Sequence, residues 1–330
     1  MKRLIAITLL ITGSLWAQST LSVPAKSVKS NPPSTSQQYC AGFISHNAIS
    51  RQNHIVASKD APHEDEFAGG SVLFIAGPTL KEGERYSILR ETKDPNREEF
   101  TPEISRKMAR LGRLYQELGW VTVHNIAGKI SIASFDFSCD AAVPGDIVVP
   151  FEAKPEISVR GTDDPINPYV SGNAINGHIL GSKDALGLLG TGSIVYLDYG
   201  ANKGAKVGEY LFIRRGYTDA ELNTVDRISE RLPKGAAIEA ANPVKVTADD
   251  QKKLPAHLLG EVVLLDVRET ASTGYILRSF AEIQLGDAVE EEEGGAAVAA
   301  HAEPAATPAA TPCTDSALWR RALFLGHKCK

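Results

Sequence analysis

Short apolar runs bounded by Gly, Pro or Asp dominate the chain from residue 39 to residue 291. Several of them alternate apolar and polar positions with the period of two that is typical of strands covered on one face. The pattern therefore predicts a mainly β fold. The expected strands are residues 54–57, 71–77, 85–91, 120–126, 130–138 and 146–152 in the first half, and 178–181, 193–200, 210–215, 261–267, 274–279 and 287–291 in the second.

The second set of predicted strands repeats the first. HIVASKDA at residues 54–61 returns as HILGSKDA at residues 178–185, and residues 119–148 match residues 260–289 without a gap. A repeat of this length indicates two tandem copies of one domain. Six short strands per copy favour a small barrel- or sandwich-like β domain.

Each copy carries an insertion between its third and fourth strands, with helical patterns near residues 103–111 and 220–232. The 330-residue chain is long enough for two domains that each bury a core. We expect a signal peptide (1–19), a Ser-, Pro- and Lys-rich linker (20–38), copy one (39–160), a hinge (161–168), copy two (169–290), a disordered acidic and Ala/Pro-rich tether (291–312) and a C-terminal segment (313–330).

The amino-terminal residues have the pattern of a secretory signal. Lys2 and Arg3 precede an apolar run that ends at Trp16, and small residues at Ala17 and Ser19 offer a cleavage site. The run is shorter than the roughly 20 residues that span a bilayer. We expect a cleaved signal and a periplasmic or secreted protein, with a retained membrane anchor as the alternative.

The formal net charge of -5 lacks the basic excess that is typical of nucleic-acid-binding proteins. We therefore expect no nucleic-acid partner.

The cysteines predict one disulfide within copy one. Aligning the two copies places Val170 opposite Cys40 and Phe280 opposite Cys139, so both cysteines are replaced by apolar residues together. This paired replacement suggests that Cys40 and Cys139 are bonded in an oxidising compartment. Two buried free thiols are the alternative.

The C-terminal segment lies between Cys313 and Cys329. A straight helix of this length would separate the two α-carbons by about 24 Å, whereas a disulfide needs about 7 Å or less. They can pair only if the chain turns back, for which Gly326 is suited; bonds to another chain are the alternative. The residues suited to a partner groove or an anionic membrane surface are Leu318, Trp319, Arg320, Arg321 and Phe324. Docking of this segment back onto the domains is also open.

The chain shows no Gly-x-Ser-x-Gly elbow, no His-Glu-x-x-His motif and no close cysteine pair. We therefore predict no catalytic residue, no cofactor and no metal site. HEDEF at residues 63–67 contains one imidazole and three carboxylates that could bind a divalent ion, but we interpret it as a solvated loop. The glycines at residues 187–192 and 200–211 resemble nucleotide-binding loops, yet the second run leads into a strand, so we interpret both as turns.

The turns at Gly145–Asp146 and Gly286–Asp287 occupy matching places in the two copies, which argues for a structural role. The matching His54 and His178 could hint at a site, but we interpret them as packed or surface histidines. The charged pairs Glu84–Arg85 and Arg214–Arg215 are expected on exposed faces.

A family resemblance covers residues 39–290. GSIVYLDYGANKGAKVGEYLFIRR, LLGEVVLLDV and the closing Gly-Asp resemble the carboxyl-terminal domain of the flagellar assembly protein T group. YCAGFIS, LYQELGWVTV and FSCDAAVPGDIVVPFE are similar to uncharacterised exported bacterial proteins, some of which carry peptidoglycan-binding LysM modules. The resemblance implies an all-β envelope domain used in assembly or anchoring.

These patterns predict an exported, non-enzymatic cell-envelope adaptor or scaffold that binds an envelope protein or peptidoglycan. The alternative is a peptidoglycan- or carbohydrate-binding module, for which Tyr196, Tyr199 and Tyr210 are the clustered aromatic candidates, although core packing explains these residues as well. A hydrolase with an unfamiliar site is a third class.

Overall fold

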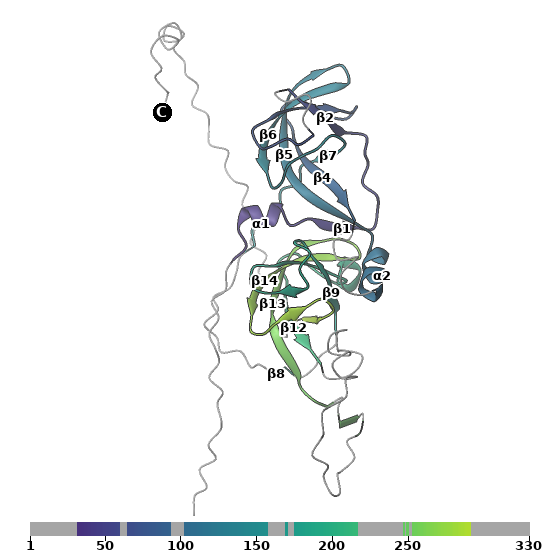
Figure 1. The fold of residues 1–330 in the computed structure, drawn as a ribbon, viewed down its shortest axis with the longest axis vertical. Helices are drawn as coiled ribbons and strands as arrows, with labels where there is room; N and C mark the ends of the chain where they lie inside the picture. Colours follow the sequence, from purple (N-terminus) through teal and green to yellow (C-terminus); the bar gives the residue numbers. More distant parts are fainter. Residues whose placement is uncertain are drawn as a thin grey trace, which may run out of the picture.

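The computed structural model describes residues 32–59, 65–93, 102–157, 169–170, 175–216, 247, 249–250 and 253–291. Within these residues the fold is mainly β, as predicted, and consists of two closed antiparallel barrels arranged end to end (Figure 1). The expected signal, hinge, second helical insertion, tether and C-terminal segment lie outside the described residues. The residues of the expected linker that precede residue 32 also lie outside the described residues.

Barrel one is a ring of six antiparallel strands in the order β5-β4-β7-β2-β3-β6, closed by pairing of β5 with β6. A short strand, β1, pairs with β5 outside this ring. The strands are β1 (Phe43–Ser45), β2 (His54–Ser58), β3 (Val72–Ala76), β4 (Arg85–Thr92), β5 (Arg113–Ala127), β6 (Ile130–Ser138) and β7 (Ile147–Pro150).

Barrel two has the same topology, with the ring order β13-β12-β16-β9-β11-β14 closed by β12 and β13. Its outer strand, β8, pairs with β13. The strands are β8 (Tyr169–Val170), β9 (Gly177–Ser182), β11 (Ile194–Leu197), β12 (Tyr210–Arg215), β13 (Ala256–Val267), β14 (Ser272–Ser279) and β16 (Ala288–Glu291); β10 (Leu188–Leu189) and β15 (Ile283–Gln284) form a separate pair. The shared topology confirms two tandem β domains.

Each barrel closes around an apolar core of its own, because the inward positions of its strands are filled by aliphatic and aromatic side chains. The core of barrel one includes Leu73, Ile75, Val121 and Phe135, and that of barrel two includes Ile179, Val195, Leu211 and Val262; all are fully buried.

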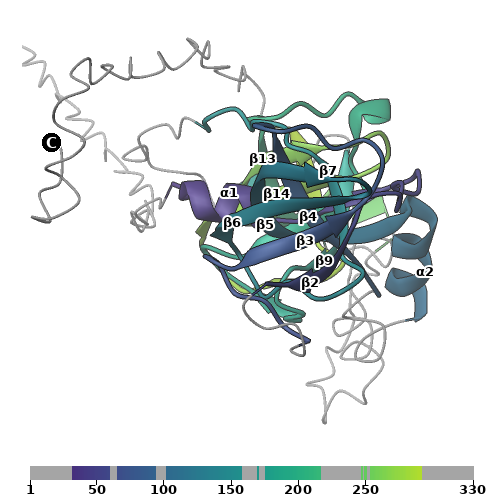
Figure 2. The same ribbon diagram turned by 90° about the horizontal axis from the view of Figure 1, so that it is seen from above.

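Two α-helices flank the junction of the barrels (Figures 1 and 2). Helix α1 (Thr35–Tyr39) begins within the segment expected to be a linker, which spans residues 20–38. Its start is fixed by a capping box, in which Ser34 and Gln37 satisfy each other's backbone N–H groups. Helix α2 (Pro102–Leu111) confirms the helix expected in the first insertion.

The disulfide between Cys40 and Cys139 is present, with α-carbons 5.5 Å apart. The alignment behind its prediction was nevertheless wrong at one position. Phe43 faces Tyr115 across β1 and β5, and Val170 faces Ala256 across β8 and β13. The registers of β4 with β5 and of β12 with β13 make Tyr115 equivalent to Ala256, so Val170 occupies the place of Phe43 and not that of Cys40.

The repeated turn before the last strand is held by a repeated ion pair. Gly145 and Gly286 adopt positive φ angles of 93° and 98°, which explains the glycine in both copies. Arg90 binds Asp146 through two bonds of 2.9 and 2.7 Å. In barrel two, the corresponding arginine binds Asp287 through bonds of 2.7 and 2.8 Å.

The arginine of the second clamp is Arg215, which with Arg214 was expected on an exposed face. That expectation was wrong. Arg214 is 3% exposed and pairs with Glu290 at 2.7 Å, and the side chain of Arg215 is 18% exposed. A charged dipeptide in a strand can be buried when each guanidinium has a carboxylate on the neighbouring strand.

Candidate functional site

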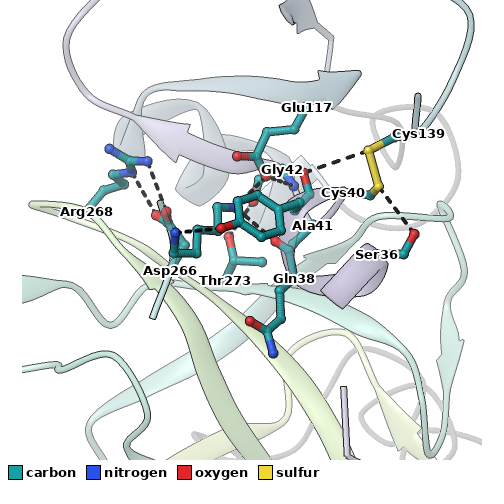
Figure 3. A network of polar contacts seen from close by, with 12 residues as sticks. Ser36, Gln38, Cys40, Ala41, Gly42, Glu117, Cys139, Asp266, Arg268 and Thr273 are labelled. Atoms are coloured by element: carbon teal, nitrogen blue, oxygen red, sulfur yellow. Dashed lines mark hydrogen bonds and ion pairs between the residues drawn. A yellow bond between two sulfur atoms is a disulfide. The ribbon is translucent and has the colours of Figure 1, made fainter. Parts of the chain in front are cut away.

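The strap is defined here as residues 38–42, the last two residues of α1 and the three that connect it to β1, and it lies between the two barrels (Figure 3). The strap offers its carbonyl groups to barrel two. The Tyr196 hydroxyl donates to the Ala41 carbonyl at 3.1 Å, and the Thr273 hydroxyl donates to the Gly42 carbonyl at 2.8 Å. Backbone groups of one domain thus satisfy buried hydroxyls of the other.

The strap is anchored on barrel one by two bonds. Cys40 is bonded to Cys139 at the end of β6. The Gly42 N–H donates to Glu117 Oε2 at 3.1 Å. Gly42 itself has φ of 72°, and a Cβ there would lie 2.8 Å from the Tyr115 carbonyl oxygen, so the close approach of strap and β5 requires glycine.

The segment that leaves barrel one is tied to the same strap. Lys154 Nζ lies 2.6 Å from Glu117 Oε2 and 2.9 Å from the Gln38 carbonyl oxygen, and the Lys154 N–H donates to the Tyr39 hydroxyl at 3.0 Å. The side chains of Glu117 and Lys154 are each only 11% exposed. Lys154 therefore fastens the leaving segment of barrel one to β5 through its ion pair and to the strap through its two hydrogen bonds.

Burial raises the pKa of Glu117 above its usual range, although the Lys154 ammonium and the Gly42 N–H oppose this effect. The negative charge of Asp266, from barrel two, raises the pKa further. Glu117 is thus a carboxyl group at a domain boundary whose ionisation is costly, and such groups are enriched at functional sites.

Barrel two contributes an apolar face to the junction. Its members lie on β12, β13 and β14 and pack with Ala41 of the strap and Ile157 of the segment that leaves barrel one; they are Tyr210, Val263, Leu265, Tyr275 and Leu277. A second contact lies at α2, where the Thr270 hydroxyl donates to the Leu111 carbonyl at 2.9 Å. Hydrophobic burial therefore holds the barrels together, and the polar bonds fix their orientation.

A cleft of about 460 Å³ opens beside the strap, with walls from both barrels. Phe43, Leu89, Val149 and Leu265 supply apolar surface. The charged lining consists of Glu117, Glu152, Lys154, Asp266 and Arg268. Volume, mixed lining and a position between domains are typical of ligand sites.

Arg268 is held in place at this cleft. Its Nε and Nη2 lie 2.7 and 2.9 Å from the two carboxylate oxygens of Asp266. Its guanidinium carbon lies 4.1 Å from the ring centroid of Phe43, on β1. The pair of charges thus belongs to barrel two and the aromatic ring to barrel one, and their contact contributes to the junction.

A second cleft, of about 360 Å³, shares Glu117 as a lining residue. Its other lining residues include Ala41, Asp140, Lys183, Asp184 and Tyr196. Glu117 therefore faces open space on more than one side of the strap.

The three tyrosines that were candidates for a sugar-binding face, with core packing as the other explanation, are buried. Tyr196, Tyr199 and Tyr210 are 3%, 2% and 7% exposed. Tyr196 binds the strap, Tyr199 donates to Glu209 at 3.1 Å, and Tyr210 packs in the junction. These tyrosines therefore occupy core and interface positions, as the packing explanation predicted, and do not form an exposed sugar-binding face.

The remaining sequence candidates lie apart from the clefts or outside the described residues. Gly204 and Gly208 have φ of 98° and 80°, which confirms the turn interpretation of residues 200–211. Among the described residues no group of three or more His, Cys, Asp and Glu side chains is arranged to hold a metal ion. The sequence candidates that fall outside the described residues are His63, Glu64, Cys313, Cys329, Leu318, Trp319, Arg320, Arg321 and Phe324.

Sequence reasoning missed an aromatic cluster on the outside of barrel one. Trp120 and Phe137 stack with ring centroids 4.1 Å apart, and Tyr39 and Phe151 stack at 5.7 Å against them. The available signal was that Trp120 and Phe137 occupy outward positions of neighbouring predicted strands.

The chain matches no family model and no curated protein.

Proposed function

We propose that this protein is an exported, non-enzymatic cell-envelope adaptor or scaffold, in which two β barrels present separate surfaces at a fixed mutual orientation. The observation that carries this proposal is the junction. The strap is bonded covalently to barrel one and through two buried hydrogen bonds to barrel two. Such a junction is useful when two binding surfaces must be held at one spacing.

Export is supported by the signal-like amino terminus and by the disulfide, because disulfides persist in oxidising compartments. Within the part of the chain that the structure describes, no helix has the length and apolar character needed to cross a bilayer.

The adaptor hypothesis is tested by site-specific photo-crosslinking in intact cells. A photoreactive amino acid is placed at His124, exposed on barrel one, or at Leu188, 62% exposed on barrel two. We expect crosslinks to a discrete envelope protein from at least one barrel. A buried position, Leu264, serves as the control that must remain silent. An absence of protein adducts from both barrels would contradict the proposal.

One observation favours a second function, the binding of peptidoglycan or another carbohydrate. Polar side chains continue from the aromatic cluster along β5 and β6. The hydroxyls of Thr122 and Ser134 donate to Asp136, and His124 Nε2 lies 2.8 Å from Ser134 Oγ. Sugar-binding surfaces combine aromatic rings with such networks of hydrogen-bonding groups.

Sedimentation with purified sacculi tests this second function. We expect the wild type to sediment and the double variant His124→Ala, Asp136→Ala to remain in solution. Leu188→Ala, on barrel two, is the matched surface control. Equal sedimentation of all three proteins would exclude this face as the sugar site.

A further inference from the structure

We propose that the 460 Å³ cleft between the barrels binds a small ligand in which an apolar chain carries one amine or guanidinium cation. This inference goes beyond the adaptor hypothesis and does not rest on it. It depends on the shape, the charge balance and the free hydrogen-bonding positions of the cleft.

The apolar part of the ligand is matched by the walls. Phe43 on β1, Leu89 on β4 and Val149 on β7 come from barrel one, and Leu265 on β13 comes from barrel two. An alkyl chain placed between them would remove apolar surface of both domains from water, which favours binding.

The charge of the ligand follows from the lining. Three carboxylates, Glu117, Glu152 and Asp266, face two cations, Lys154 and Arg268, so one negative charge is left in excess. Lys154 pairs with Glu117, and Arg268 pairs with Asp266. Glu152 is exposed at the rim. A single positive charge would balance the cleft, whereas an anion would increase its imbalance.

Glu117 supplies the acceptor. Both of its bonds, from Gly42 N–H and from Lys154 Nζ, go to Oε2. Oε1 has no partner among the described residues. Because burial raises the pKa of Glu117, its charged form lacks sufficient stabilisation. A ligand cation at Oε1 would supply that stabilisation and would lower the pKa of the carboxyl.

The test is an NMR titration of the mature full-length protein with three probes of equal length: pentylamine, pentanol and pentanoate. We expect pentylamine to shift signals of residues that line this cleft, and pentanol to bind at least about fivefold more weakly because it lacks the charge. We expect no binding of pentanoate. Equal affinities for pentylamine and pentanol would overturn the proposal, as would shifts that map elsewhere.

Glu117→Gln should weaken pentylamine binding at least about fivefold, because glutamine keeps a carbonyl acceptor for Gly42 but removes the charge. The matched control is Asp184→Asn, which removes a carboxylate from the second cleft only. Equal losses in both variants, or no loss in Glu117→Gln, would contradict the assignment.

If Glu117→Gln does not fold, the wild type supplies the answer through pH. Pentylamine affinity should decrease as the pH falls through the raised pKa of Glu117, because protonation removes the acceptor charge. A pH-independent affinity would overturn the role of Glu117. The other charged or titratable groups around it, whose own titrations must be considered in the fit, are Lys93, Asp140, Glu152, Lys154, Lys183, Asp184, Tyr196, Asp266 and Arg268. Crosslinking to an envelope protein is independent of these results, so the two proposals can fail separately.

Discussion

In barrel two the outer face of β12, β13 and β14 is apolar and buried, whereas the same face of barrel one, on β4, β5 and β6, is polar and open to solvent. The sheet registers make the positions equivalent, because Arg85 faces Thr122 as Tyr210 faces Val263. The corresponding pairs are Arg85 and Tyr210, Thr122 and Val263, His124 and Leu265, Ser134 and Tyr275, and Asp136 and Leu277.

At the next pair of positions the difference is reversed, because the apolar residues lie in barrel one and the charged residues in barrel two. Barrel one has Trp120 opposite Phe137, whereas barrel two has Glu261 opposite Arg278, joined by a buried ion pair with an Nε–Oε2 distance of 2.8 Å. Both copies thus share an apolar interior, whereas the polar or apolar character of the outer face depends on the segments that cover it. In barrel two the cover includes Ala41 and Ile157 from segments that flank barrel one.

The largest effect should come from exchanging residues between the two faces. Leu277→Asp places a carboxylate at a position that is 1% exposed and should lower the free energy of unfolding by about 4 kcal/mol. The reciprocal variant, Asp136→Leu, changes an exposed position and should cost about 0.5 kcal/mol or less. Urea denaturation measures both. Similar costs would show that the two faces do not differ in burial.

Removal of the disulfide should come next. The bond joins residues 99 positions apart, and replacing Cys40 and Cys139 by Ser should cost about 3 kcal/mol, mainly through unfolded-state entropy. Because the bond lies within barrel one, amide exchange should increase there and at the strap more than in the interior of barrel two. A uniform increase over both barrels would argue that they unfold as one unit.

The repeated Arg–Asp clamps should respond alike. Asp146→Ala and Asp287→Ala each remove a two-bond ion pair from a largely buried carboxylate and should each cost about 2 kcal/mol. Thermal or urea unfolding gives the comparison. A cost in only one barrel would mean that the clamp is not part of the shared fold.

The smallest effect concerns a residue that only barrel two has. Burial would raise the pKa of Asp198, but hydrogen bonds from His178 outweigh burial and lower it below the usual value of 3.8. The folded state therefore gains stability above the unfolded pKa and loses it as the pH falls through the folded pKa.

Asp198→Asn should cost about 1 kcal/mol near neutral pH, and this cost should shrink as the pH falls through the lowered folded pKa and vanish only below it. Barrel one has Ala76 at the matching position, beside His54, and so has no equivalent contribution. Urea midpoints measured from pH 7 downward provide the test. A difference that persists undiminished at low pH would show that Asp198 acts through packing and not through its charge.

Much of the fold was readable from local pattern. Alternation identified the strands of both rings, although β5 and β13 begin before the predicted residues and the short strands β1, β8, β10 and β15 were not expected. The helix of the first insertion was found at its observed position. The turn glycines were also identified, because positive φ angles are a local requirement of the backbone. The disulfide was found from a comparison of copies that was misaligned at Val170, since β1 and β8 are too short to fix a register by sequence.

The candidate site was not readable in the same way. Glu117 lies on a strand whose sequence gives no sign that a strap will cover it, and Lys154 is 37 residues away in the chain. Arg214 and Arg215 were placed on an exposed face because hydropathy treats each residue alone, whereas burial of a charge depends on a partner from another strand.

The sequence by itself determined the duplication, the strand positions and the shared turns, because these depend on the period of apolar residues and on backbone preferences within a few positions. Only the tertiary structure decided which outer face is covered, where Glu117 meets Lys154, and that a cleft opens beside the strap. Those features arise from contacts between distant segments, and the free energy of such contacts is not contained in any local pattern.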